Sequence, residues 1–376
     1  MGNLREQQSG SSKDNMLRSI IIFLVVTTSF AIAYTQSPLF TSNQNQYFLH
    51  GLADAGFGNL SQDWLVNTLD PTPVFSQLVS LTDQFFGPHF IFYFYYALLM
   101  GVYLFSLVGI VLNVYELRRT PAAFSVFLAL LILVHSAGLR FLLSRTLGVN
   151  WAYILEDGLA DQRILGPVFQ PSTFGVLLIL SIYLCLHKHP FLAVLSAVIA
   201  ATVHPTYLLS AALLTLSFMV AAYFEERKVI KPLLIGGLAL LTVSPILYYV
   251  LSNFANTHPE STALAREILV NFRIPHHAQI DWWFDATAVI KILFVVAAIY
   301  LVRKLKPLFI ILMTLTTAAA GLTIAQLILD SDALALIFPW RVSTILVPVS
   351  VSIIIGYLVL YISQRFKEQF AKQTNL

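Results

Sequence analysis

The chain has 376 residues, of which 57% are hydrophobic and only 11% are charged, and its mean hydropathy is +0.76. So few charges cannot cover the surface of a soluble protein of this length, so the composition excludes the soluble classes and indicates a polytopic membrane protein. The net charge of +3 is better explained by membrane topology than by nucleic-acid binding, and we expect no nucleic-acid partner.

The hydrophobic segments predict an all-α fold with about ten transmembrane helices, since a span needs roughly 20 mostly apolar residues. The fourth to sixth segments are short, so a re-entrant pair is an alternative. We expect a single transmembrane domain at 16–365, between a disordered cytoplasmic tail at 1–15 and a second tail at 366–376. The predicted spans are approximately 17–35, 90–114, 121–139, 172–187, 190–204, 206–223, 232–252, 286–302, 307–328 and 342–363.

Charge placement orients these spans. If the N-terminus is cytoplasmic, most of the 22 Lys and Arg residues fall in inner segments, as the positive-inside rule requires. We therefore predict a multi-pass protein of the cell (inner) membrane with both termini in the cytoplasm. Cleavage of the first span is left open, because Ala31-Ile32-Ala33 also fits a signal-peptidase site.

Three long segments fall on the outer side, at about 36–89, 140–171 and 253–285. Long connections of this kind are usually functional, so we expect a site on the outer face. Apolar residues recur at helical spacing over 74–86 and 261–272, which predicts short interfacial helices there.

Few familiar sites fit this sequence. The single cysteine, Cys185, allows neither an intramolecular disulfide nor a cysteine metal site. The chain matches no P-loop, dinucleotide-binding, zinc or serine-hydrolase motif. No cofactor is certain, and a divalent metal held by carboxylates remains open.

The first outer segment contains the carboxylates Asp54, Asp63 and Asp70, and no Lys or Arg. A carboxylate near a membrane cavity can act as a general base or hold a divalent ion, so these three are the catalytic candidates. The alternative is that all are solvated loop residues, with Asp70-Pro71 forming a turn.

The second outer segment contains Glu156, Asp157, Asp161 and Arg163, and leads into Pro171-Ser172. Pro171-Ser172 is suited to start a helix whose N-terminus faces outward and receives an anion such as a phosphate. Helix capping alone explains Ser172 equally well.

Two further positions interrupt apolar runs. His204-Pro205 breaks a hydrophobic stretch, so His204 either caps a tight turn or points into a cavity as a substrate contact or proton carrier. Lys291 lies within the predicted eighth span, where snorkelling to the outer surface is the default expectation.

Arginine, histidine and tryptophan gather in the later outer segments, as Arg266, Arg273, His276-His277, Asp281-Trp282-Trp283 and Pro339-Trp340-Arg341. A guanidinium binds phosphate bidentately and an indole stacks on a sugar, so these residues suit the binding of a phosphate or a sugar. An interfacial aromatic belt is the alternative for the tryptophans. Adjacent histidines are poorly spaced to share one metal.

The arrangement of a cytoplasmic N-terminus, one span and a long acidic outer loop resembles the C-type superfamily of glycosyltransferases, which use lipid-phosphate-linked sugars. The resemblance implies an acid shortly before a Tyr early in that loop, whereas Asn43 to Gln46 precede Tyr47. Five runs are also similar to a bacterial family of polytopic membrane proteins known only as a domain of unknown function. They are Asn45–Gly51, Asp161–Gly166, Gln170–Gly175, His204–Tyr207 and Phe338–Arg341.

These features lead to the hypothesis of an enzyme that moves a sugar from a polyprenyl-phosphate donor at the outer face. Asp63 would be the base, and outer arginines would stabilise the leaving phosphate. Alternatives are a transporter or flippase and a non-catalytic assembly subunit. The substrate-binding candidates are Arg140, Arg145, Arg163, His204, Arg273, His276 and Arg341.

Overall fold

The computed structural model describes residues 2–87, 89–254 and 258–373, and side chains between 17 and 366 within these ranges. All elements in these ranges are helical, which confirms the all-α class. Six helices are long and apolar enough to cross a membrane, or seven if one bent pair forms a single span. The six belong to α1 (Gly2–Tyr34), α5 (Ile91–Val114), α10 (Leu208–Glu226), α11 (Ile230–Phe254), α16 (Lys306–Leu329) and α18 (Ser343–Gln373).

The bent pair consists of α6 (Pro121–Val134) and α7 (Ala137–Leu147), which meet at an angle of 57°. The break occurs because the Ser136 side chain accepts the Leu139 N–H at 3.1 Å and so starts a new helix. Three shorter apolar helices, α8 (Val176–Leu186), α9 (Pro190–Val203) and α15 (Ala286–Val302), cover the remaining predicted spans. The number of spans above seven therefore stays a prediction.

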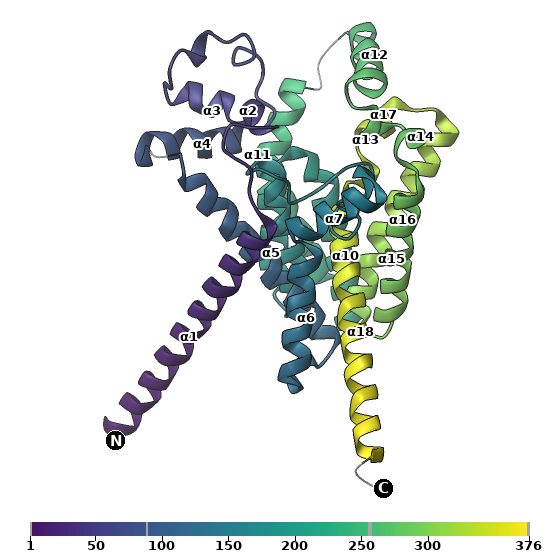
Figure 1. Ribbon diagram of the computed structural model, residues 1–376. Helices are drawn as coiled ribbons and strands as arrows, with labels where there is room; N and C mark the ends of the chain where they lie inside the picture. The colour runs from purple at the N-terminus through teal and green to yellow at the C-terminus, as the bar shows by residue number, and fades with distance from the viewer. Residues whose placement is uncertain (1, 88, 255–257, 374–376) are drawn as a thin grey trace.

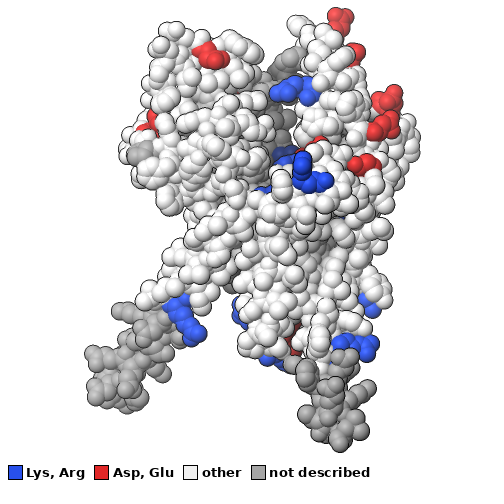
Figure 2. All heavy atoms as spheres, viewed as in Figure 1, with Lys and Arg blue, Asp and Glu red and all other residues white. Residues whose placement is uncertain are grey.

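Both chain ends lie at one end of the bundle, here the terminal end, and the irregular segments gather at the opposite, distal end (Figure 1). Acidic side chains are prominent at the distal end, whereas basic side chains are visible both at the terminal end and in the distal half (Figure 2). The segments 74–86 and 261–272 are helical, as α4 and as α12 with a following π-turn, while their interfacial position stays a prediction. The distal helices are α2 (Gln44–Tyr47), α3 (Leu49–Asp54), α4 (Pro73–Phe86), α12 (Pro259–Ile268), α13 (Pro275–Ala278), α14 (Ile280–Trp283) and α17 (Asp332–Leu336).

The segment 148–171 is mostly buried although it is helical only in the short turn η3 (Val149–Trp151) and at its last residue, where η4 begins. Irregular backbone inside a membrane protein requires hydrogen-bond partners from the protein. The Tyr96 hydroxyl of α5 accepts the Gly166 N–H at 2.9 Å and donates to the Gly166 carbonyl. The Leu159 N–H donates to Ser343 Oγ at 2.7 Å. These contacts fix the segment against α5 and the start of α18.

Aromatic side chains fill the core beneath the distal lobe of α2, α3 and α4. Phe169 from the buried segment packs against Phe48, Phe75 and Phe92, with ring centroids 5.3–6.3 Å apart. Helix α3 approaches α4 closely because it carries Gly51. A Cβ at Gly51 would lie 2.4 Å from the Ser76 carbonyl oxygen and 2.7 Å from Val79 Cβ.

We therefore expect Gly51→Ala to destabilise the protein by about 1–3 kcal/mol, because α3 would have to move off α4. The melting temperature in detergent should fall. Gly237→Ala on α11 is the matched control, since a Cβ there meets nothing within 4 Å and Ala favours a helix. Equal melting temperatures for the two variants would contradict the tight packing of α3.

Candidate functional site

Three proline-led turns at the distal end each pass directly into a helix. They are η4 (Pro171–Gly175) before α8, η5 (Pro205–Tyr207) before α10 and η7 (Pro339–Val342) before α18. Proline fits the first turn of a helix and disfavours the α conformation in the residue before it. Gln170 and His204 are accordingly extended, with φ values of −157° and −134°.

These three turns border one cavity of about 410 Å³, here the distal cavity, which has the size of a small-molecule site. Its walls come from the first outer segment, the buried segment 148–171, the turns η4 and η7, His204 directly before η5, and helix α13. The lining residues are Ser42, Asn43, Tyr47, Asp161, Gln162, Arg163, Pro167, Gln170, Ser172, His204, His276, His277 and Arg341.

Arg341 and His204 form the centre of one wall. Arg341 Nη2 lies 2.8 Å from His204 Nε2, and because a guanidinium only donates, the histidine is the acceptor and is neutral, with its proton on Nδ1. His204 is 4% exposed, and the Arg341 guanidinium stands 5.0 Å over the Tyr207 ring. Among the described residues, neither Arg341 Nε nor His204 Nδ1 has a hydrogen-bond partner.

Arg163 also lines the cavity, but its guanidinium is already engaged. Its Nε lies 3.1 Å from Asp157 Oδ2, and its guanidinium stands 4.2 Å over the Tyr153 ring. Burial raises the pKa of Asp157 to about 7, although the neighbouring Arg163 acts in the opposite direction. Within the described part of the chain, Arg341 is therefore the arginine of the cavity wall that has no carboxylate partner.

Asp161 is the carboxylate on the cavity wall, and its backbone is strained. Ala160 and Asp161 have φ values of 56° and 51°, a left-handed conformation that costs a residue with a side chain about 1 kcal/mol or more. His277 Nδ1 donates to the Ala160 carbonyl at 2.5 Å. Burial lowers the pKa of His277 to about 4, so it is neutral near pH 7 and keeps this donor.

Lys291 supports the same loop from α15. It does not snorkel to the surface as expected, because it is 6% exposed and its Nζ donates to the Gly158 carbonyl at 2.8 Å. A buried ammonium is stabilised by such a carbonyl and by nearby carboxylates, and Asp157 and Asp161 are both close enough to act on it.

Two glutamines leave polar atoms unsatisfied beside the cavity. Gln162 is 1% exposed, and neither its amide oxygen nor its nitrogen has a partner among the described residues. Gln170 Nε2 donates to Ser172 Oγ at 2.8 Å, while its Oε1 has no partner there. Buried polar atoms are nearly always hydrogen-bonded, so a roomy polar cavity at this point suits water or a polar ligand.

Four of the predicted substrate-binding residues line the distal cavity together: Arg163, His204, His276 and Arg341. Arg273 is exposed at the end of the π-turn Leu269–Arg273, outside this lining. The positive charge of Arg273 still acts on Tyr47, which lines the cavity. Burial raises the pKa of Tyr47, and both Arg341 and Arg273 oppose that rise.

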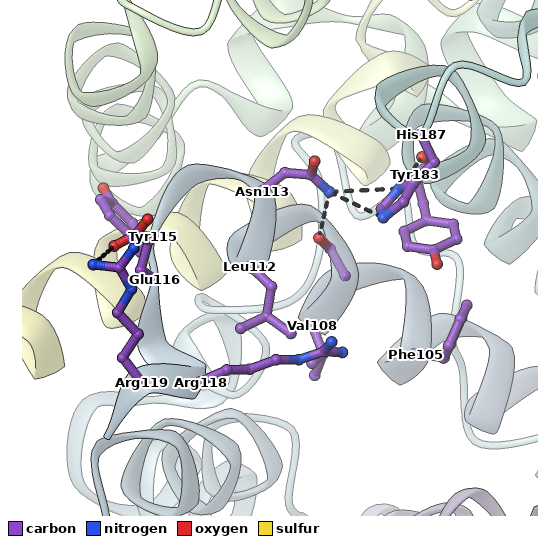
Figure 3. Close-up of a pocket in the computed structure, with 11 residues that line it drawn as sticks. Phe105, Val108, Leu112, Asn113, Tyr115, Glu116, Arg118, Arg119, Tyr183 and His187 are labelled. Atoms are coloured by element: carbon purple, nitrogen blue, oxygen red, sulfur yellow. Dashed lines mark hydrogen bonds and ion pairs between the residues drawn. The ribbon is translucent and has the colours of Figure 1, made fainter. Parts of the chain in front are cut away.

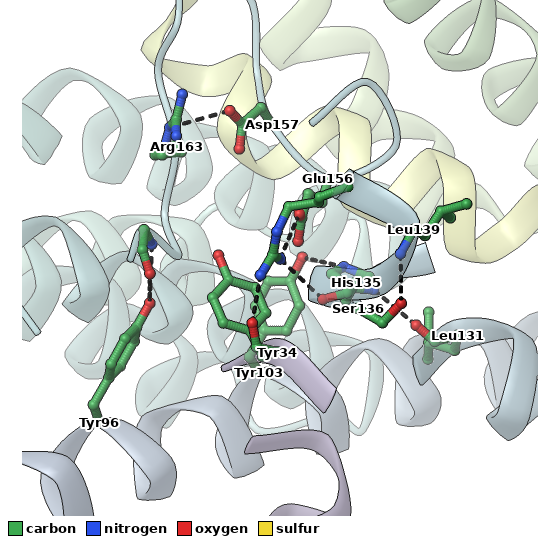
Figure 4. Close-up of polar contacts among 12 residues, drawn as sticks. Tyr34, Tyr96, Tyr103, Leu131, His135, Ser136, Leu139, Glu156, Asp157 and Arg163 are labelled. Carbon is green, nitrogen blue, oxygen red and sulfur yellow. Dashed lines mark hydrogen bonds and ion pairs between the residues drawn. The ribbon is translucent and has the colours of Figure 1, made fainter. Parts of the chain in front are cut away.

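Arg140 and Arg145 do not line the distal cavity. Arg140 is a scaffold residue: its Nη1 donates to Glu156 Oε1 at 2.9 Å and to the His135 carbonyl at 3.0 Å, and its Nη2 donates to the Tyr34 carbonyl. Figure 4 shows this group, in which the Tyr103 hydroxyl also lies 2.9 Å from His135 Nε2. Arg145 is exposed on α7.

The three candidate carboxylates of the first outer segment lie away from the distal cavity. Asp54 ends α3 and is exposed. Asp63 is also exposed, and its Oδ1 accepts the Leu65 N–H at 2.8 Å. Asp70 Oδ1 accepts the Thr72 N–H at 2.8 Å, as expected of a turn, and this residue lines a separate cavity of about 150 Å³.

Several lining residues were not among the predicted site residues, notably Tyr47, Asp161, Gln162 and Gln170. All four residues lie in the five sequence runs that are similar to the bacterial family of unknown function. Each of these runs contributes to the cavity wall or to its turns, so membership of a run is the signal that could have identified them. Asn43 also lines the cavity, while Gln44 is structural: its Oε1 accepts the Phe40 N–H at 2.6 Å and its Nε2 donates to the Phe169 carbonyl.

In the described part of the chain, no three His, Cys, Asp or Glu side chains are grouped as metal ligands. No protein-family model, no curated protein and no solved structure matches this sequence. The geometry of the distal cavity is therefore the basis for a functional proposal.

The raised pKa of Asp157 predicts a pH-dependent stability. The native state holds this proton more tightly than the unfolded chain, so the contribution of Asp157 to stability should fall as the pH rises from about 4 to 7, by up to ~1.4 kcal/mol per pH unit. The lowered pKa of His277 acts in the opposite direction over the same range, so the effect of Asp157 is read as a difference between variants. The melting temperature of the wild type should therefore fall relative to that of Asp157→Asn as the pH rises across this range. Asp63→Asn, on the exposed loop, is the control and should keep the wild-type dependence of melting temperature on pH. If Asp157→Asn also kept this dependence, another group would be responsible for the titration.

Proposed function

We propose that the chain is a membrane enzyme of glycosyltransferase type, whose distal cavity on the outer face binds the phosphate of a polyprenyl-phosphate-linked sugar. The observation that supports this most is the position of Arg341, whose Nε is unpaired among the described residues, at the cavity where α8, α10 and α18 begin. Helix N-termini favour anions, and a guanidinium matches the oxygens of a phosphate.

In the proposed reaction an acceptor hydroxyl oxygen attacks the anomeric carbon of the sugar. The bond from this carbon to the phosphate oxygen breaks, and the lipid phosphate leaves with the electron pair. Arg341 stabilises the developing negative charge, and the acceptor proton passes to the Asp161 carboxylate. We assign the base to Asp161 in place of Asp63, because Asp161 lines the cavity and Asp63 is exposed outside it.

One observation favours a transporter as the second candidate. The apolar run breaks at His204, between α9 and α10, and this break borders the distal cavity. Interrupted helices beside a polar site are common in transporters. In that case the cavity would bind the same anionic class of ligand but release it unchanged.

The test uses the full chain in micelles with radiolabelled polyprenyl-phosphate sugars. Removing one charge-stabilising donor typically costs about 10²–10³ in kcat, so Arg341→Gln should lose that much, and Arg145→Gln on exposed α7 should turn over like the wild type. Asp161→Asn should lose kcat with little change in KM.

Full turnover by Arg341→Gln would contradict the proposed role of the cavity. Loss of activity in Asp63→Asn, with Asp161→Asn active, would return the base to the first outer segment. Saturable, Arg341-dependent movement of the lipid across proteoliposomes without any transfer of sugar would establish the transporter instead.

A further inference from the structure

A second cavity, of about 370 Å³, lies at the terminal end between α5, α8 and the turn η2 (Leu117–Arg119) (Figure 3). Its lining divides along α5. Phe105, Val108 and Leu112 give one part an apolar wall, and Asn113 and Arg118 make the part beyond them polar. We call it the terminal cavity.

The wall facing α5 is rigid because Tyr183 packs directly on the helix backbone. A Cβ at Gly109 would lie 2.3 Å from the Tyr183 ring, so this approach requires glycine. The Tyr183 ring also packs in a tilted arrangement against His187 with centroids 4.0 Å apart, and Asn113 Nδ2 lies 3.4 Å from the His187 ring nitrogens. The cavity is therefore bounded by side chains that hold one another in place.

The charges of the polar part are unequal. Arg119 Nη1 pairs with Glu116 Oε2 at 2.7 Å. Arg118 is exposed and makes no hydrogen bond or ion pair with any described residue, and its guanidinium is drawn beside Val108, next to the apolar part (Figure 3). The cavity thus carries one available positive charge at the junction of its polar and apolar parts.

We propose that the terminal cavity binds an anionic phospholipid, with the headgroup phosphodiester on Arg118 and the glycerol ester and first methylene groups against Val108 and Leu112. A positive charge at this end satisfies the positive-inside rule without any cavity, so topology alone does not explain the apolar part. A free phosphate would not contact the apolar part. A phospholipid would contact both parts, because its charged headgroup lies at the membrane surface and its acyl chains lie deeper. This site is independent of the distal cavity and of its proposed reaction.

The test is native mass spectrometry of the full chain, titrated with phosphatidylglycerol or phosphatidylcholine in mixed micelles. The wild type should retain one phosphatidylglycerol with a Kd several-fold below that for phosphatidylcholine. Arg118→Gln should raise the phosphatidylglycerol Kd about fivefold, the factor typical of one basic residue at an anionic membrane surface. Val108→Phe, which keeps every charge and fills the apolar part, should also weaken retention.

Arg303→Gln is the matched control, because Arg303 is an exposed arginine that donates to the Tyr300 carbonyl at 2.7 Å and lies over the Tyr300 ring. Its Kd should stay within about twofold of the wild type, because one distant exposed charge contributes little. Equal losses in Arg118→Gln and Arg303→Gln would reduce the effect to general surface charge and overturn the proposal. Equal retention of the two lipids, or full retention by Val108→Phe, would overturn it as well.

Discussion

The structure depends on how an irregular segment is buried among helices. Residues 148–171 expose backbone groups that neither lipid nor a helical ladder can satisfy, so partners must come from elsewhere in the protein. Tyr96, Lys291 and Ser343 supply them from α5, α15 and the start of α18. The segment is thereby held between those helices, and its residues Asp161 and Arg163 line the distal cavity.

The buried charges divide into two kinds. Arg140 with Glu156, and Arg163 with Asp157, are pairs whose disruption would leave an uncompensated charge in the interior. Burial raises the pKa of Glu156 despite Arg140 beside it, which shows that desolvation of this carboxyl is only partly offset. These pairs fix the scaffold and thereby leave Arg341 as the arginine of the distal cavity wall that has no carboxylate partner among the described residues.

The helical class, and α4 and α12 through their periodicity, could be predicted from the sequence. His204 was selected for the proline-marked break that follows it, and Arg163 and Arg341 for their predicted place on the outer side. All three line the distal cavity. The sequence could not place Asp63, because a loop without periodicity does not determine which way its side chains point. Arg140 was predicted as a substrate-binding residue, but it pairs with Glu156, 16 residues away in the chain. No local sequence pattern predicts a contact between residues so far apart.

The distal cavity is assembled from almost the entire chain, since its wall begins at Ser42 and ends at Arg341. During synthesis the first contributors enter the membrane long before the last turn, η7, has been made. His204 Nε2 therefore lacks its Arg341 partner in the partly formed bundle until η7 has been made. Completion of the final helix is thus the step that creates a site, and a protein interrupted before it would be a membrane-inserted chain without one.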